Sequence, residues 1–196
     1  MVKGVFLSLA LLAVVVVFYS VDSWLIRRYD RFRSSGSSRS WSYTVMAWTA
    51  GAAVILQPLV LPRLGLSTTA AWGLGIQALG VVVVGAALAL HWWARGTLRQ
   101  YYGEREEVQP GQRLVCAGPY VYVRHPIYVS YFALALGLVL LAPALTTAAA
   151  AVYAFADFMQ AAGREEKLLV ERLPGYREYM RRVGRFFPRL GSSPGR

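Results

Sequence analysis

Long uncharged runs alternate with short basic segments along this 196-residue chain. Residues 4–21 carry no charged side chain, and further apolar runs occupy residues 43–61, 64–94 and 127–156. A helix needs about 20 apolar residues to cross a hydrocarbon core of about 30 Å. The pattern therefore predicts an all-α integral membrane protein. We read the first run as a retained helix, because it is longer than the 7–15-residue core of a signal peptide.

Five transmembrane helices in one domain, residues 1–196, account for these runs. The last run is too long for one span, and Pro143 near its middle would break a helix. We expect a helical hairpin there, or a re-entrant pair. The expected spans are residues 4–21, 43–61, 69–91, 127–142 and 144–163, with a cytoplasmic connector at 95–126 and a short helical cytoplasmic tail at 164–196.

The sequence also predicts several short segments outside the spans. A flexible loop is expected at 31–42 and an outer connection at 64–68. Turns are expected at Pro110-Gly111 and Pro174-Gly175, and a helix from the second of these turns to about Val183.

Charge orients the predicted bundle. The formal net charge is +11, and 19 of the 21 basic residues follow the first, third or fifth span. The positive-inside rule then places the N-terminus outside and the C-terminus in the cytoplasm. Such a charge in a soluble protein suggests nucleic acid, but with these apolar runs it favours anionic lipid instead. Only Lys3 and Lys167 are lysine among the basic residues, and this bias towards arginine suggests a GC-rich bacterial genome. The expected location is therefore a bacterial plasma membrane.

The segment from Arg124 to Tyr128 combines Arg, His and Tyr at the mouth of an apolar run. Proline is favoured in the first turn of a helix, so Pro126 is expected to begin the fourth span. Arg124 and His125 then precede a helix N-terminus, where the free N–H groups favour an anion. Alternatively, Arg124 extends to phospholipid and the tyrosines belong to an aromatic belt.

A pair of adjacent carboxylates, Glu165-Glu166, follows the fifth span. At the C-terminal end of a helix they would oppose its dipole, so a cationic partner is expected. That partner is either a neighbour, Arg164 or Lys167, or the ammonium of a ligand. The hairpin returns this pair to the same membrane face as Arg124, so the two clusters can share one pocket.

Asp157 lies two helical turns before Glu165, on the same predicted helix face. A charge at this depth usually faces the protein interior. We expect it to line the lipid-facing side of the pocket and to act as a base if the substrate is an amine. Alternatively, it extends to the interface or pairs with an arginine.

Metal and nucleotide-hydrolysis sites find little support. The chain has two histidines and one cysteine, Cys116, so no zinc site is expected. Cys116 is interpreted as a small packing residue. No Ser-His-Asp arrangement, glycine-rich dinucleotide fingerprint or P-loop stands out.

Four motifs together resemble the signature of the isoprenylcysteine carboxyl methyltransferase and phospholipid methyltransferase superfamily. They are Arg124-His125-Pro126-x-Tyr128, Glu165-Glu166-x-Leu168-Leu169, Pro174-Gly175-Tyr176-x-x-Tyr179 and Val183-x-Arg185-Phe186. The resemblance implies an integral membrane methyltransferase that uses S-adenosylmethionine and methylates an amphipathic or lipid-like substrate at the cytoplasmic face.

The resemblance also implies roles for individual residues. Asp157 and Glu165 become candidate catalytic bases, and Arg185 a candidate catalytic residue that closes the pocket from the tail. The substrate is expected to enter sideways between helices. The implied cofactor residues are Tyr120, Arg124, His125, Pro126, Tyr128, Glu165, Glu166, Tyr176 and Tyr179.

One departure bears on the substrate. Members that methylate prenylated cysteine often carry an arginine a few residues before the acidic pair, whereas this chain has Met159-Gln160-Ala161-Ala162 there. Bacteria are also expected to lack prenylated proteins, so a lipid amine, a lipid acid or an isoprenoid is expected. Two other functions stay open: an NADPH-dependent enzyme similar to sterol reductases, and a non-enzymatic protein that binds anionic lipid or a partner.

Overall fold

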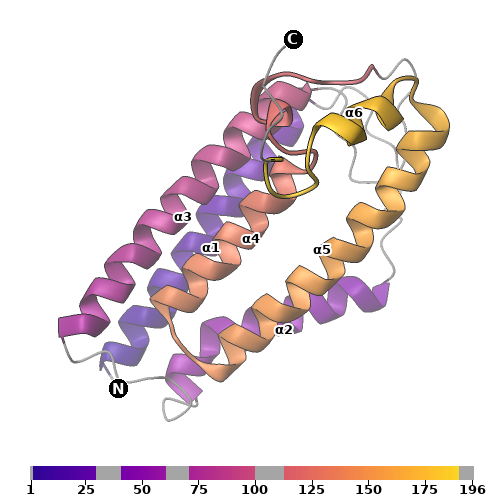
Figure 1. The fold of residues 1–196 in the computed structure, drawn as a ribbon. Helices are drawn as coiled ribbons and strands as arrows, with labels where there is room; N and C mark the ends of the chain where they lie inside the picture. Colours follow the sequence, from indigo (N-terminus) through magenta and orange to yellow (C-terminus); the bar gives the residue numbers. More distant parts are fainter. Residues whose placement is uncertain (1, 30–40, 61–70, 100–112, 190–196) are drawn as a thin grey trace.

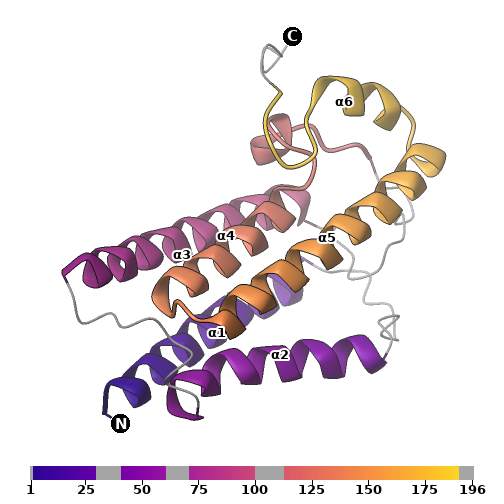
Figure 2. The same cartoon turned by 60° about the horizontal axis from the view of Figure 1, so that its bottom comes forward.

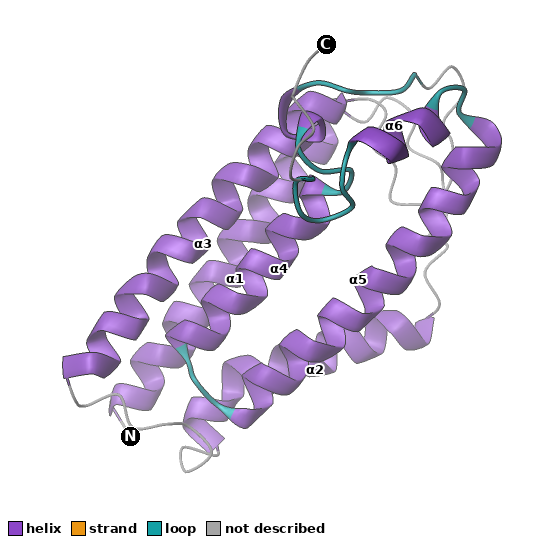
Figure 3. Ribbon diagram, viewed as in Figure 1, coloured by secondary structure: helices purple, strands orange, loops and turns teal. Residues whose placement is uncertain are grey.

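The computed structural model describes residues 2–29, 41–60, 71–99 and 113–189. These residues form helices and loops, with no strand among them (Figure 3). Residues 31–40 of the predicted loop, residues 64–68, the Pro110-Gly111 turn and the last residues of the tail lie outside the described residues. The described elements are α1 (Val2–Tyr29), α2 (Trp41–Val60), α3 (Ala71–Leu98), the 3-10 helix η3 (Gly118–Val121), α4 (Pro126–Leu141), α5 (Leu145–Arg172) and α6 (Tyr176–Arg182).

Each predicted span falls on one helix, so the all-helical class is confirmed for the described residues. Two stretches, Gly4–Leu25 and Gly73–Leu98, are long and apolar enough to cross a membrane by length and composition. Gly51–Val60 and Pro126–Leu141 are shorter apolar helices. The protein thus has the features of a membrane protein, while the five-span topology and the orientation of the termini stay predictions.

Helices α1, α3 and α4 run side by side, while α5 leaves α4 at a tight turn and diverges towards α6 (Figure 1). Helix α2 lies against α1 and the first part of α5 (Figure 2). The buried apolar cluster between these helices includes Leu11 of α1, Val54 of α2, and Val84 of α3. Helix α4 therefore packs along its length against α3, whereas α5 separates from it towards α6.

Two glycines bring α3 and α4 close together. A Cβ added to Gly80 would lie 3.1 Å from the backbone oxygen of Gly137, and one added to Gly137 would lie 2.6 Å from a methyl carbon of Val84. Small residues at such crossings let helix backbones approach in membranes, where van der Waals packing drives association. This crossing fixes α4 on α3.

The hairpin turn predicted at Pro143 is confirmed. Helix α4 ends at Leu141 and α5 begins at Leu145. Polar side chains satisfy the backbone there: Gln77 of α3 donates to the Leu141 carbonyl at 3.1 Å, and Thr147 accepts from the Ala144 N–H at 3.1 Å. The Thr147 hydroxyl in turn lies 2.7 Å from the Ala142 carbonyl.

The acidic pair does not lie at the C-terminal end of a helix, where the sequence predicted it. Helix α5 continues without a break to Arg172, so Glu165-Glu166 lies inside the helix, not at its end. The extra turns contain good helix formers, and Leu169 and Val170 pack against the buried Leu173. The predicted break at Pro174-Gly175 is confirmed, with Gly175 at φ 84°, and α6 follows it to Arg182.

Candidate active site

The tail returns to the start of α4 and pairs with it through the backbone. The Arg124 N–H donates to the Gly184 carbonyl at 2.8 Å, and the His125 N–H donates to the Arg185 carbonyl at 3.1 Å. Val123 and Gly184 form an isolated parallel bridge. Pro126 begins α4, as its position in the sequence predicts, and is fully buried. The side chains of residues 124 and 125 are thereby held between α4, α5 and the tail.

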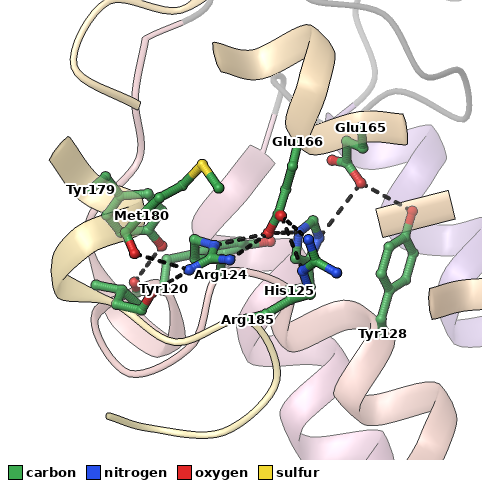
Figure 4. Close-up of polar contacts among 10 residues, drawn as sticks. Tyr120, Arg124, His125, Tyr128, Glu165, Glu166, Tyr179, Met180 and Arg185 are labelled. Atoms are coloured by element: carbon green, nitrogen blue, oxygen red, sulfur yellow. Dashed lines mark hydrogen bonds and ion pairs between the residues drawn. The ribbon is translucent and has the colours of Figure 1, made fainter. Parts of the chain in front are cut away.

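Glu166 of α5 is the centre of this arrangement (Figure 4). Its Oε1 accepts from the Arg124 Nε at 2.9 Å and lies 3.1 Å from the His125 Nε2. Its Oε2 accepts from the Arg185 Nε at 3.0 Å. The carboxylate is 4% exposed, so one buried acid joins two arginines and a histidine from distant parts of the chain.

Electrostatics keep this carboxylate charged. Burial alone raises the pKa of Glu166, but the hydrogen bonds from His125, Arg185 and Arg124 outweigh it and lower the pKa to about 2. One carboxylate therefore faces two guanidinium groups. Arg124 is 7% exposed and Arg185 is 36% exposed, so Arg185 is the guanidinium group that a ligand can reach more easily.

Glu165 is the accessible acid of the pair. Its Oε2 accepts from the Tyr128 hydroxyl at 3.1 Å and lies 3.6 Å from the His125 Nδ1. The rings of His125 and Tyr128 are parallel within 3°, with centroids 5.3 Å apart. Because the Glu165 side chain is 36% exposed, it can receive a hydrogen-bond donor from a ligand. We call Arg124, His125, Glu165, Glu166 and Arg185 the tail-side cluster.

Two tyrosines attach the tail to this cluster. The Tyr179 hydroxyl donates to the Tyr120 carbonyl of η3 at 2.6 Å. Tyr176 and Tyr179 are buried against Leu173, and burial raises the pKa of both phenols above the ordinary range. Both are therefore neutral, and they pack the tail onto η3 and the end of α5.

The structure brings together most residues that the motifs singled out. Glu166 pairs with Arg124 and Arg185, which lie 42 and 19 residues away in the sequence, and not with its neighbours. Asp157 lies apart: it is half-buried, and the described residues show no hydrogen bond or ion pair to it. Eight residues along a helix correspond to about 12 Å, so Asp157 lies well below Glu165 on α5. Its role as a base stays a prediction.

A second polar cluster was not singled out from the sequence. Asp22 of α1 has its Oδ1 2.9 Å from the His91 Nε2 and 2.8 Å from the Arg95 Nε, both on α3. The other ring nitrogen, His91 Nδ1, lies 3.0 Å from the Ser130 Oγ of α4. We call Asp22, His91, Arg95 and Ser130 the bundle-side cluster. A Ser-His-Asp sequence of contacts therefore exists, although none stands out in the sequence.

This arrangement differs from a hydrolytic triad in its burial. His91 and Ser130 are fully buried, and the Ser130 hydroxyl lies 2.6 Å from the Ile127 carbonyl one turn earlier. A serine nucleophile must reach its substrate, so Ser130 is not placed for that role. The signal that could have identified the cluster is Asp22 itself, an acid within a helix that is otherwise long and apolar enough to span.

Three comparisons relate this chain to known proteins. Residues 78–171 match the model of the isoprenylcysteine carboxyl methyltransferase (ICMT) family. The nickel-cobalt-cadmium resistance protein NccN of Alcaligenes xylosoxydans xylosoxydans is 42% identical over 78 residues, which is 39% of this chain and 37% of that protein. The cobalt-zinc-cadmium resistance protein CzcN of Cupriavidus metallidurans is 41% identical over 78 residues, 39% of this chain and 36% of that protein. The match thus spans little more than a third of these curated relatives.

The fold is also similar to a solved structure, that of the eukaryotic intramembrane Ras methyltransferase ICMT. The TM-score is 0.68 at 21% sequence identity, and the superposition covers 94% of this chain and 67% of that chain. The likeness extends well beyond residues 78–171 and includes the helices before them.

Proposed function

We propose that this chain, whose residues 78–171 match the isoprenylcysteine carboxyl methyltransferase family and whose fold is similar to that of such an enzyme, transfers a methyl group from S-adenosylmethionine to an amphipathic substrate. We place the reaction at the cytoplasmic face of a bacterial plasma membrane. The observation that carries the proposal is the tail-side cluster, which exposes one acidic and one basic side chain, Glu165 and Arg185, each 36% exposed.

The chemistry of these side chains fits the proposed cofactor. S-adenosylmethionine carries a carboxylate, an ammonium and ribose hydroxyls, and it supplies an electrophilic methyl group. A guanidinium group binds carboxylates, and Arg185 is partly exposed beside an internal carboxylate that is already charged. Glu165 accepts hydrogen bonds and can receive an ammonium or hydroxyl group.

Glu166 has a different part in this proposal. Its two oxygens are occupied by Arg124, His125 and Arg185, so it organises the cluster from within. We therefore propose Glu165 as the member of the acidic pair that touches the cofactor. Methyl transfer asks mainly for positioning and exclusion of water, and the buried charges on either side of Glu165 supply a rigid frame for both.

Aromatic side chains support a lipid-like substrate. Next to Tyr128, Phe158 of α5 lies 5.2 Å away between ring centroids, and Phe132 of α4 contacts both Phe155 and Phe186. Phe155 is 48% exposed, so the aromatic surface reaches from the cluster to the outside of α5. We propose that the apolar part of the substrate approaches along this surface, with Asp157 as the base if the reacting group is an amine.

The names of the curated relatives add no metal site to this proposal. No group of three or more His, Cys, Asp or Glu side chains that could hold a metal ion occurs in the described part of the chain.

The test is calorimetric titration of S-adenosylmethionine, S-adenosylhomocysteine and NADPH into the purified protein in detergent. The Glu165→Gln variant should bind the first two about 10-fold more weakly, because it loses a charge-assisted hydrogen bond. The matched control is Glu178→Gln on α6, whose exposed carboxylate pairs with Arg181 and Arg182 only within its own helix. It should bind as the unmodified protein does.

The remaining outcomes would contradict the proposal. Binding of NADPH alone would indicate the reductase-like function, and binding of none of the three would favour a lipid-binding or partner-binding role. If the cofactor binds, incubation with methyl-labelled S-adenosylmethionine and bacterial lipid extract should place label in the organic phase. Label that stays only in water-soluble products would exclude a lipid substrate.

A further inference from the structure

The bundle-side cluster fixes the orientation of its own histidine. A carboxylate only accepts hydrogen bonds, so the proton on the His91 Nε2 points at Asp22, 2.9 Å away. The Asp22 carboxylate is held in turn by Arg95, whose side chain is 3% exposed. His91 itself is fully buried and its ring packs on Phe18, with centroids 4.6 Å apart. The imidazole therefore has one orientation, set by groups on α1 and α3.

This fixed imidazole contacts the first turns of α4. The Nδ1 of His91 lies 3.0 Å from the Ser130 Oγ, which also lies 2.6 Å from the Ile127 carbonyl. The next residue, Tyr131, has its ring 5.4 Å from the His91 ring and stacks on Phe158 of α5 at 5.0 Å. Contacts from His91 thus reach both α4 and α5 just below the tail-side cluster.

The same part of α4 carries two residues of the candidate site. Tyr128 is one turn before Tyr131, and His125 is the residue from which α4 starts. On the tail side, His125 and Arg124 are held by backbone hydrogen bonds to residues 184 and 185. On the bundle side, the Ser130 hydroxyl joins the first two turns of α4 to His91 of α3. The start of α4 is held between two charged clusters.

We propose that Asp22, His91 and Arg95 form a positioning network for the candidate site. Through Ser130 and Tyr131 they set the position of the first turn of α4, and thereby the placement of His125 and Tyr128 beside Glu165. None of the three touches the tail-side cluster in the described contacts, so they act through α4. The inference rests on the proposed site, but it concerns the geometry of that site and can be tested without any ligand.

The chain offers a direct spectroscopic test, because it has only two histidines. In protein labelled with ¹⁵N-histidine, NMR should show two imidazoles, and a His125→Asn variant assigns them. Asp22→Asn removes the charge that orients His91 and keeps the shape of the side chain. We expect the signals of both histidines to move. Movement of His91 alone, with His125 unchanged, would overturn the proposal.

A second variant and a matched control separate positioning from a general loss of stability. Ser130→Ala removes the polar contact between His91 and α4, together with the hydroxyl contact to the Ile127 carbonyl, and it also serves if Asp22→Asn does not fold. Thr147→Val is the control, because it too removes buried hydroxyl contacts of the hairpin, but at the opposite end of α4 and α5. Ser130→Ala should move the His125 signal and Thr147→Val should not. Equal movement in both variants, or in neither, would overturn the proposal.

Binding of S-adenosylhomocysteine gives an independent readout. A misplacement of about 1 Å in a site can cost about 100-fold in rate, and we expect Ser130→Ala to weaken binding at least about 10-fold while Thr147→Val leaves it unchanged. If the unmodified protein binds no S-adenosylhomocysteine, the proposed function fails. The NMR comparison still decides the positioning network in that case.

Discussion

The two polar clusters are built from the same kinds of side chain but differ in whether a ligand can reach them. On the tail side, Glu166 joins Arg124, Arg185 and His125, and the adjacent Glu165 is 36% exposed. On the bundle side, Asp22 joins Arg95 and His91, and the contacts end at Ser130, which is fully buried. One cluster is open to a ligand and the other is closed.

The difference shows that a carboxylate bonded to arginine and histidine has different uses in a buried cluster and in a partly exposed one. A buried ion pair contributes little net stability over apolar packing, but removal of one partner is costly. Such a pair therefore fixes geometry strongly. In the closed cluster only that effect remains, whereas the open cluster adds an accessible acidic group, Glu165, that can meet a ligand.

The largest expected effect is that of Glu166→Gln, which removes the internal charge of the open cluster. Arg124 is 7% exposed and would lose its counter-charge, so we expect a loss of about 3–5 kcal/mol in the free energy of unfolding. The tail should also become sensitive to trypsin. Glu178→Gln, with an exposed carboxylate, is the control, and its unfolding free energy should change by less than about 0.5 kcal/mol. Equal effects in both variants would contradict the internal role of Glu166.

The second prediction concerns pH. The folded-state pKa of Glu166 is lowered to about 2 from an ordinary value of 4.5. A lowered pKa contributes stability above the unfolded value, which is lost as pH falls through the folded value. We expect a loss of about 3 kcal/mol between about pH 5 and pH 2. Glu166→Gln should flatten this part of the profile, measured by thermal unfolding at each pH. An unchanged slope would show that other acids dominate.

The third prediction concerns the contact between α3 and α4, the helices that carry His91, Arg95 and Ser130 of the closed cluster. Gly137→Ala places a Cβ 2.6 Å from a Val84 methyl carbon, so α3 and α4 must move apart at a cost of about 1–3 kcal/mol. His91 and Arg95 are on the displaced helix α3, whereas Glu166 is on α5. Gly85→Ala, which meets no atom within 4 Å, is the control. Thermal unfolding should show a loss of stability for Gly137→Ala and none for Gly85→Ala, because alanine is the better helix former where it meets no clash.

The smallest expected effect on stability is that of Glu165→Gln. The carboxylate is 36% exposed, and we expect the free energy of unfolding to change by less than about 0.5 kcal/mol. Its effect on cofactor binding should nevertheless be the clearest of the acidic pair, as measured by calorimetry. A large loss of stability in this variant would mean that Glu165, like Glu166, belongs to the internal framework.

Local signals in the sequence predicted much of the open cluster. Pro126 and Pro143 mark a helix start and a turn through the restrictions of the proline ring, and both are where the structure has them. The hairpin between them then returns residues 124 and 166 to the same end of the fold, where the structure shows them in contact. One of the two alternatives for the cationic partner of the acidic pair was wrong for Glu166. It pairs with Arg124 and Arg185, not with its neighbours Arg164 and Lys167.

The closed cluster could not be predicted in the same way. Asp22 follows the apolar run at residues 4–21 and so looks like its boundary, but α1 continues to Tyr29. Its partners lie 69 and 73 residues away, and helical periodicity does not say which helices pack together. The acidic pair was placed at a helix end for a related reason, since charged residues end an apolar run without ending a helix.

The polar groups at the tip of the α4–α5 hairpin bear on how deep the protein can sit. Sixteen residues of helix extend about 24 Å, less than the hydrocarbon thickness of about 30 Å. If the end of the hairpin that carries Arg124 and Glu166 lies at one surface of the bilayer, the turn between α4 and α5 therefore lies at the depth of the lipid tails. The Leu141 carbonyl and the Ala144 N–H are already bonded to Gln77 and Thr147. A position of the tip inside the hydrocarbon region would therefore leave neither of these backbone groups unpaired.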